Sequence, residues 1–309
     1  GLTRYSDPMV IGLDALRELG RAHDLAKPSL FDLLRKNRRP EDLAILIYTS
    51  GTTGKPKGAM HNHAALVYMC HGYNQVIVQD EHDERMLFLP LCHVAERLGG
   101  QYFSIYTGTI LNFVENPDTV PENVREIAPT TFTAVPRVWE KFYSSVTIAV
   151  SESDQIQQVM YRWALGIGYK VSDKVTQGQS VPLWLKACFY IGRWLALDNV
   201  RRMIGIHKAK ILVTGAAPIS PDLVRWYLAL GVPMIEAWGM TESCGAATVM
   251  PADRIKAGLI GPAAPFNEVR LDPVTQELLV RGPNVFMGYL NLPEKTAETI
   301  DADGWLHTG

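Results

Sequence analysis

One stretch decides how this chain folds: Tyr48-Thr49-Ser50-Gly51-Thr52-Thr53-Gly54-Lys55-Pro56-Lys57-Gly58. It follows residues 43–47, a run of apolar and β-branched side chains that predicts a buried strand. The ten residues 49–58 are three Thr, three Gly, two Lys, one Ser and one Pro, so they cannot build a core. They offer hydroxyl groups, backbone N–H groups left open by glycine, and two ammonium charges. These are the groups needed to wrap a polyphosphate.

The loop differs from the P-loop pattern G-x-x-x-x-G-K-[ST], in which the lysine is followed directly by a hydroxyl residue and a helix. Gly51 and Gly54 are three residues apart, and Pro56 follows Lys55. Proline lacks an N–H and disfavours helical backbone at the residue before it, so no helix can start at Lys55. We expect hydroxyls and loop amides to hold a phosphate. A flexible linker would share the Gly, Ser and Thr, but would rarely follow a strand and carry two closely spaced lysines.

Composition limits the class of protein. The chain has 309 residues, a formal net charge of −2 and 47% hydrophobic residues, which suffices for a large core. A nucleic-acid-binding protein would usually carry a basic excess, so we expect no nucleic-acid partner. The four cysteines lie far apart without a C-x-x-C pair, which favours a reducing, cytoplasmic compartment over a disulfide or metal framework. We expect this chain to be part of a longer protein at both ends.

The hydrophobic periodicity predicts an α/β fold. Strands that alternate with helices imply parallel sheets flanked by helices, and such sheets bind ligands at the carboxyl ends of their strands. The loop 49–58 and the turns 90–93 and 135–137 are expected at such ends. Strands are expected at 42–48, 85–91, 109–114, 131–135, 210–214 and 233–237. Helices are expected at 10–23, 29–36, 61–73, 96–106, 119–127, 137–150 and from Ser220 to Gly231.

Residues 151–205 are expected to be helical and are rich in aromatic side chains. Residues 181–200 are apolar enough to consider a membrane span, but Lys186, Arg193 and Asp198 interrupt them. A buried or amphipathic helix is the better interpretation. Contact with a membrane surface stays open, because Trp and basic residues suit the interface.

Two later segments carry candidate site residues. Gly215-Ala216-Ala217-Pro218 follows an expected strand, and its small side chains would let a flat ligand approach the backbone. Trp238-Gly239-Met240-Thr241-Glu242-Ser243 follows another, and offers an aromatic face, a hydroxyl and a carboxylate. Trp238 could stack on a purine, Thr241 could bond a phosphate oxygen and Glu242 could hold Mg²⁺. A core Trp, a capping Thr and a solvated Glu are the alternatives, and the grouping favours a site.

The C-terminal part changes character. From Cys244 onward, short strands alternate with Pro/Gly turns, which predicts a small antiparallel or barrel-like β lobe. We therefore expect an α/β core over residues 1–243, with 151–205 as a helical insertion, and a β-rich lobe over residues 244–309.

Four ordered blocks resemble the adenylate-forming (AMP-binding) superfamily, which includes acyl-CoA synthetases. They are the stretch 48–58, Gly215-Ala216-Ala217-Pro218, Trp238-Gly239-Met240-Thr241-Glu242 and Gly304-Trp305-Leu306-His307-Thr308-Gly309. The resemblance covers nearly all of the chain from Glu41 and implies the family's large domain. It also implies that the small C-terminal domain with the family's catalytic lysine is absent, so this chain alone would form little or no thioester.

The resemblance implies a reaction and a set of site residues. A carboxylate would attack the α-phosphate of ATP to give an acyl-adenylate, and a thiol, usually of coenzyme A, would then displace AMP. Thr49 and Glu242 would help hold Mg²⁺, and Thr241, Glu242 and Lys55 would be catalytic. The phosphates would contact Thr49, Ser50, Gly51, Thr52, Thr53, Gly54, Lys55 and Thr241. The adenine would contact Gly215, Ala216, Ala217, Pro218, Glu236, Ala237, Trp238, Gly239 and Met240. The carboxylate substrate would contact His93, Val135 and Pro136.

The segment Leu89–Arg97 indicates which class of carboxylic acid is the substrate. Peptide-synthetase domains hold an amino acid's ammonium with an Asp there, and this segment has none. Its Glu96-Arg97 pair and the insertion 151–205 resemble the long-chain fatty acyl-CoA synthetase branch.

A carrier-protein or reductase acceptor stays an alternative, as does a non-catalytic nucleotide- or acyl-binding module. His93 is as readily structural as part of a site. The sequence leaves the oligomeric state open, a homodimer included.

Overall fold

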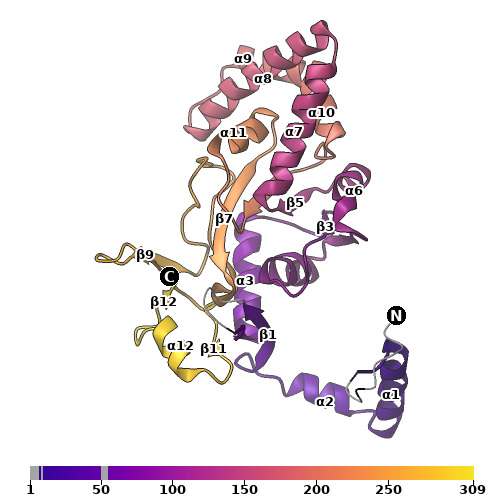
Figure 1. The fold of residues 1–309 in the computed structure, drawn as a ribbon, viewed down its shortest axis with the longest axis vertical. Coiled ribbons are helices and arrows are strands. Elements are labelled where there is room, and N and C mark those ends of the chain that lie inside the picture. Colours follow the sequence, from indigo (N-terminus) through magenta and orange to yellow (C-terminus); the bar gives the residue numbers. More distant parts are fainter. Residues whose placement is uncertain (1–6, 8–9, 50–54) are drawn as a thin grey trace. The chain divides into compact units, whose positions relative to one another are not determined.

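The computed structural model describes residues 7, 10–49 and 55–309 (Figure 1). The chain divides into two compact units, Gly1–Asp42 and Leu43–Gly309. The first unit contains helices α1 (Leu13–Ala26) and α2 (Leu30–Lys36). Both helices were expected from the apolar periodicity of these residues.

Parallel strands form the centre of the second unit. One sheet has the order β5-β6-β7-β8, in which β5, β6 and β7 run parallel and β8 is antiparallel to β7. A separate two-stranded sheet pairs β3 with β4 in parallel. The expected α/β class is therefore confirmed. These strands are β3 (Glu84–Leu87), β4 (Ile110–Phe113), β5 (Thr131–Ala134), β6 (Ile211–Gly215), β7 (Met234–Met240) and β8 (Gly245–Val249).

Helices alternate with these strands and dominate residues 151–205, as expected. The segment expected as one helix over 96–106 is built from α4, a π-helical stretch and α5. The helices concerned are α4 (Val94–Glu96), the π-helix Arg97–Tyr102, α5 (Phe103–Thr107), α6 (Val120–Ile127), α7 (Pro136–Glu152), α8 (Gln155–Thr176), α9 (Leu183–Gly192), the π-helix Arg193–Leu197, α10 (Asp198–Met203) and α11 (Pro221–Ala229).

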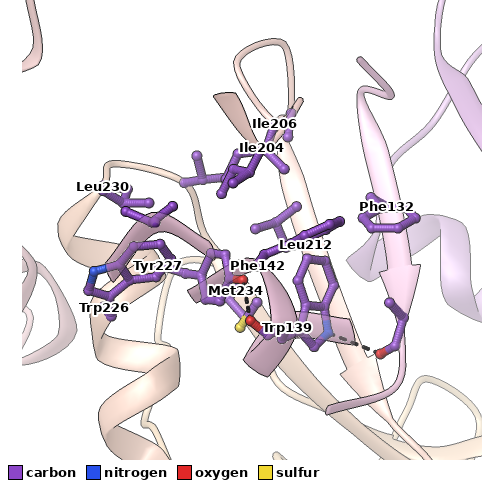
Figure 2. Packing of buried hydrophobic residues seen from close by; sticks show 14 of the residues in the cluster. Phe132, Trp139, Phe142, Ile204, Ile206, Leu212, Trp226, Tyr227, Leu230 and Met234 are labelled. Carbon is purple, nitrogen blue, oxygen red and sulfur yellow. Dashed lines mark hydrogen bonds between the residues drawn. The ribbon is translucent and has the colours of Figure 1, made fainter. Parts of the chain in front are cut away.

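An aromatic core joins α7 and α11 to the four-stranded sheet (Figure 2). The ring of Trp139 packs edge to face on Phe132 of β5 and on Tyr227 of α11, with ring centroids 5.2 and 5.3 Å apart. The Trp139 indole donates to the Ala134 carbonyl at 3.0 Å, and the Tyr227 hydroxyl donates to the Trp139 carbonyl at 2.9 Å. Because both polar tips are paired, the rings are buried without leaving a donor unsatisfied.

Two antiparallel strands flank the glycine-rich stretch, which corrects the expected parallel arrangement. β1 (Leu43–Thr49) pairs with β2 (Lys57–Asn62), and β2 also pairs with β11 (Gly288–Tyr289). The loop therefore joins two antiparallel neighbours instead of leading from a parallel strand into a helix.

The helix expected from residue 61 was also placed too early. It is α3 (His63–Val76), and the Asn62 side chain caps it by accepting from the Ala65 N–H at 2.8 Å.

The C-terminal part contains a three-stranded antiparallel sheet in the order β12-β10-β9, with helix α12 (Pro293–Thr299) nearby in the chain. Its strands are β9 (Glu268–Leu271), β10 (Leu278–Arg281) and β12 (Leu306–His307). Over the described residues this sheet is open, so the antiparallel expectation is confirmed and the barrel-like one is wrong. Its three strands, of four, four and two residues, are too short and too few to close into a barrel. The domain boundary after residue 243 stays a prediction.

The aromatic segment was considered as a membrane span. None of the helices in the described part of the chain combines the length and the apolar character needed to cross a bilayer.

The contact between α8 and α11 gives a test of the packing. A Cβ added at Gly168 would lie 2.1 Å from the Ala229 carbonyl oxygen, whereas one added at Gly166 would meet nothing within 4 Å. Gly168→Ala should lower the free energy of unfolding by about 1–3 kcal/mol, because α11 must move away. Gly166→Ala, the matched control on the same helix, should raise it by roughly 0.5–1 kcal/mol. Urea unfolding measures both, and equal effects would contradict this packing.

Candidate active site

A short 3₁₀ turn, Thr241–Ser243, follows β7 and carries the candidate acid Glu242. The strand was expected to end at residue 237, but it continues to Met240 because β8 returns beside it. The Ser243 hydroxyl accepts from the Met240 N–H at 3.0 Å and lies 2.7 Å from the Gly245 carbonyl. A Cβ on Gly239 would come within 1.9 Å of that carbonyl, so only glycine fits this close approach.

Glu242 is buried, with 6% of its surface exposed. Its backbone carbonyl accepts from the Phe286 N–H at 2.8 Å, and its Oε1 accepts from the Tyr289 hydroxyl at 2.5 Å. Burial raises the pKa of Tyr289 well above its ordinary value, and the bond to Glu242 and that residue's charge act in the same direction. The phenol therefore stays protonated and donates to the carboxylate. Tyr289 was missed from sequence, because no local pattern marks a partner 47 residues away.

The hairpin places Thr49 close to the other end of the phosphate loop. Thr49 pairs with Lys57 in register, and its Oγ1 is buried without a hydrogen-bond partner among the described residues. Lys57 Nζ lies 4.3 Å from the centroid of the Tyr289 ring. Lys55 is exposed. The predicted phosphate contacts Ser50, Gly51, Thr52, Thr53 and Gly54 lie outside the described residues.

These oxygen donors suit a magnesium ion. Mg²⁺ in proteins is usually held by one or two carboxylates together with substrate phosphates and waters. Glu242 supplies a buried carboxylate, and Thr49 supplies a buried hydroxyl that is unpartnered within the described part of the chain. The residues present therefore fit the ion, with the remaining ligands left to the nucleotide and to solvent.

The end of β6 carries the small residues that were predicted to approach a ligand, and this role stays a prediction. Gly215 pairs with Ala237 of β7, and a Cβ on Gly215 would lie 2.7 Å from the Ala237 carbonyl oxygen. Ala216 has a φ of +66°, in the left-handed region, and Ala216, Ala217 and Pro218 are exposed. Small side chains thus leave the backbone of this turn open to an approaching ligand.

The predicted adenine residues of β7 divide between the two faces of the strand, as alternation requires. Trp238 and Met240 pack against a cluster that includes Phe286 and Tyr289, whereas Ala237 packs against a different cluster. Glu236 Oε1 accepts from the Gly258 N–H at 2.8 Å. Burial raises the pKa of Glu236, and the Gly258 amide opposes this shift.

The predicted acyl-site residues come from two sheets. Val135 follows β5, whose last residue, Ala134, pairs with Thr214 of β6, and Pro136 is the buried first residue of α7. The structure thus brings Val135 and Pro136 to the same sheet edge as Gly215. His93 follows β3 of the other sheet and is exposed, and its Nδ1 accepts from the Ala95 N–H at 3.2 Å as the cap of α4.

Glu96 organises the segment that carries His93. It is buried, and its Oε1 accepts from the Phe88 N–H at 2.8 Å. Burial raises the pKa of Glu96, while the Phe88 amide and the Arg85 guanidinium oppose the shift. Arg85 is also buried and donates to the Thr133 hydroxyl at 3.1 Å, and burial lowers its pKa to about 10. The sequence marked Glu96 only as a family feature, because this tertiary role has no local signal.

A buried histidine of β2, His61, lies near the backbone of Thr241. His61 of β2 is fully buried, and neither ring nitrogen forms a hydrogen bond with the residues that the structure describes. Burial lowers the pKa of His61 to about 4, and the nearby Thr241 backbone opposes this shift. The ring is therefore neutral near pH 7 and packs at 6.5 Å, centroid to centroid, from Phe286.

Comparison with known proteins identifies the family. The model of the AMP-binding enzyme family matches residues 7–290, so the chain belongs to the AMP-binding enzyme family. The resemblance seen in the sequence is therefore confirmed at the level of the family.

Similar proteins include fatty-acid–CoA ligases. A putative fatty-acid–CoA ligase, fadD11, of Mycobacterium tuberculosis is 36% identical over 273 residues, covering 88% of this chain and 48% of that protein. The long-chain-fatty-acid–CoA ligase ACSBG2 of Xenopus laevis is 32% identical over 293 residues, covering 91% of this chain and 39% of that protein. This chain thus spans about half the length, or less, of these relatives.

A solved structure agrees with the fold. The inhibitor-bound N-terminal domain of FACL13 from Mycobacterium tuberculosis matches with a TM-score of 0.61 and 23% identity, covering 87% of this chain and 57% of that one. At this identity the match supports the α/β fold and nothing further.

The Glu96–Arg85 pair can be tested by a double-mutant cycle. Glu96→Gln keeps an oxygen to accept the Phe88 N–H but leaves the buried Arg85 charge uncompensated, so we expect a loss of about 1–3 kcal/mol in the free energy of unfolding. Arg85→Met should also destabilise. The double variant should be more stable than the sum of the single changes predicts, by roughly 0.5–3 kcal/mol. Guanidinium unfolding supplies the four values, and strict additivity would show that the two charges do not interact.

Proposed function

We propose that the full-length protein activates a fatty acid as its acyl-adenylate and transfers the acyl group to coenzyme A. The observation that carries this proposal is the contact between the acidic turn and the loop hairpin, made by Tyr289 against Glu242 and Lys57. This contact joins the Glu242 carboxylate to Lys57, at the base of a loop whose residue types suit a polyphosphate, and so supports the proposal. The relatives named fatty-acid–CoA ligases support the choice of substrate and acceptor.

In the first step the fatty-acid carboxylate forms a bond to the α-phosphorus of ATP, and the bond to the bridging oxygen breaks to release pyrophosphate. In the second step the coenzyme A sulfur forms a thioester and AMP leaves. Both reactants of the first step are anions, so the site must neutralise and align them. We propose that Lys55 and the hydroxyls and amides of residues 49–54 receive the β- and γ-phosphates, and that Thr241 bonds the α-phosphate.

Thr49 and Glu242 would hold Mg²⁺. A bound Mg²⁺ supplies electrostatic stabilisation of phosphate charge in such reactions. Around the nucleotide, residues 215–218 and 236–240 would contact the adenine. Alternate residues of β7 face opposite sides of the sheet. Ala237 would therefore contact the adenine through its backbone, and Trp238 would contact it through its ring.

The acyl part of the site would be formed by Val135, Pro136 and His93. Each CH₂ group of a buried alkyl chain contributes about 0.8 kcal/mol, so the depth of the acyl pocket would set the preferred chain length.

We further propose the division into residues 1–243 and 244–309, with a lysine-bearing domain outside this chain. A carrier protein or a reductase remains the alternative acceptor. The free cysteines support a reducing, cytoplasmic setting.

We also propose that the aromatic helical segment contacts a membrane surface. Leu183, Tyr190 and Trp194 are exposed, the last by 77%, at spacings that share one face of the continuous helix 183–197, and the exposed Trp184 lies beside that face. Exposed Trp and Tyr beside the basic Lys186 suit the boundary between headgroups and acyl chains.

Vesicle co-sedimentation tests this contact. Trp184→Gln/Trp194→Gln should reduce the bound fraction on anionic vesicles several-fold, because the two rings supply most of the exposed aromatic area on this face. Val274→Gln removes an equally exposed side chain from the C-terminal lobe and serves as the control. Equal binding of all three proteins would contradict the proposed face.

ATP–pyrophosphate exchange tests the main proposal. The full-length protein should exchange labelled pyrophosphate into ATP in the presence of a fatty acid in the range of about C8 to C18, the span that CH₂ burial could sort. Amino acids should not support exchange. Glu242→Ala should lower the exchange rate and raise the Mg²⁺ concentration needed for half-maximal rate. Glu294→Ala, an exposed acid on α12, is the matched control.

Absence of exchange with every acid in that range would refute the enzyme reading and leave the binding-module alternative. Exchange that is normal in Glu242→Ala, with unchanged Mg²⁺ dependence, would remove Glu242 from the metal role while leaving the reaction in place.

A further inference from the structure

Tyr289 is held rigidly at the point where the candidate site meets the C-terminal part of the chain. Its strand β11 pairs with β2, with Tyr289 opposite Ala59 and Gly288 opposite Met60. The next residue, Leu290, donates its N–H to the Gly58 carbonyl at 2.8 Å, and Tyr289 donates its own N–H to the Thr296 hydroxyl at 2.9 Å. The backbone of Tyr289 is therefore fixed by both the hairpin β1–β2 and helix α12.

The side chain of Tyr289 is fixed as well. It is buried, with 4% of its surface exposed, and its ring packs edge to face on Phe286 with centroids 4.8 Å apart. Phe286 in turn donates its N–H to the Glu242 carbonyl. The hydroxyl thus reaches Glu242 from a ring that cannot turn freely, and it engages Oε1. Across the described residues we find no hydrogen bond to Oε2.

The same ring faces the loop. Lys57 is the second lysine of the glycine-rich stretch, and its ammonium lies 4.3 Å from the Tyr289 centroid. One side chain thus contacts the carboxylate through its hydroxyl and the base of the loop through its face. Two segments that would have to act on the same polyphosphate are connected by a single residue.

We propose that Tyr289 is a positioning residue for the cation site: its hydroxyl holds Oε1 of Glu242 so that Oε2 is directed to the cation of the bound metal–ATP complex, in register with the loop stem at Lys57. This rests on the proposed function. Partners that orient a ligating side chain typically contribute 10- to 100-fold to metal affinity, and a rigid donor on one carboxylate oxygen is such a partner.

The test is binding of Mn²⁺–ATP to the full-length protein, followed by electron paramagnetic resonance without any acid substrate. Tyr289→Phe removes the hydroxyl and keeps the ring against Lys57 and Phe286. It should weaken binding about 10- to 100-fold. The KM for the fatty acid should stay within about twofold, because a loss confined to metal–nucleotide binding leaves the acyl site intact. Tyr68→Phe, an exposed tyrosine of α3, is the matched control and should bind as the wild type does.

A cycle with Glu242→Gln separates positioning from general packing. If Tyr289 acts through the Glu242 carboxylate, adding Tyr289→Phe to Glu242→Gln should cause little further loss. A thermal midpoint within a few degrees of the wild type would accompany the expected result. Unchanged Mn²⁺–ATP binding in Tyr289→Phe, or a full additional loss in the double variant, would overturn the inference alone. A wild-type protein that binds no Mn²⁺–ATP would instead overturn the proposed function on which it rests.

Discussion

The turn Thr241–Ser243 is the point on which the rest of the site depends. Its polar groups are paired by one later segment: Asn284 donates to the Ser243 carbonyl at 2.7 Å, Phe286 to the Glu242 carbonyl, and Tyr289 to the Glu242 carboxylate. That segment also forms the edge strand beside β2. A few hydrogen bonds therefore connect the end of the parallel sheet to the hairpin that carries the phosphate loop. They join the sheet that ends at the acid to the separate sheet that carries the loop.

Close backbone approach is what makes this connection compact. At Gly239 the hairpin β7–β8 comes so near that a methyl group would overlap the Gly245 carbonyl, and at Gly215 the neighbouring strand leaves little more room. Glycine at these two positions reduces the stability of a strand, by roughly 0.5–1 kcal/mol each relative to alanine. The chain accepts that loss where the strands end, because the carbonyls of Gly245 and Ala237 occupy the space that a side chain would need.

How far the sequence could predict this structure depended on whether the signal was local. The strand at residues 43–49 and the glycine-rich loop after it are local features, and so is the aromatic helical region. β2 was missed because Lys57–Asn62 is polar at both ends, and its pairing with β1 and β11 outweighs its weak strand preference. The barrel-like expectation for the lobe failed because alternation fixes strand faces but not how many strands close a sheet. Tyr289 could not be found, because its hydrogen bond crosses 47 residues.

Two buried acids differ in the partners that balance their charge. Glu96 accepts a backbone N–H, and the charge of buried Arg85 acts on it, so its negative charge is already compensated. Glu242 is similarly buried, but its side chain accepts from a neutral phenol, and no ion pair to it occurs among the described residues. A buried carboxylate is costly without a positive partner. A cation arriving with a nucleotide would remove that cost, whereas at Glu96 it would find a charge already balanced. The difference in partners, rather than in residue type or burial, is what favours Glu242 over Glu96 for the proposed metal role.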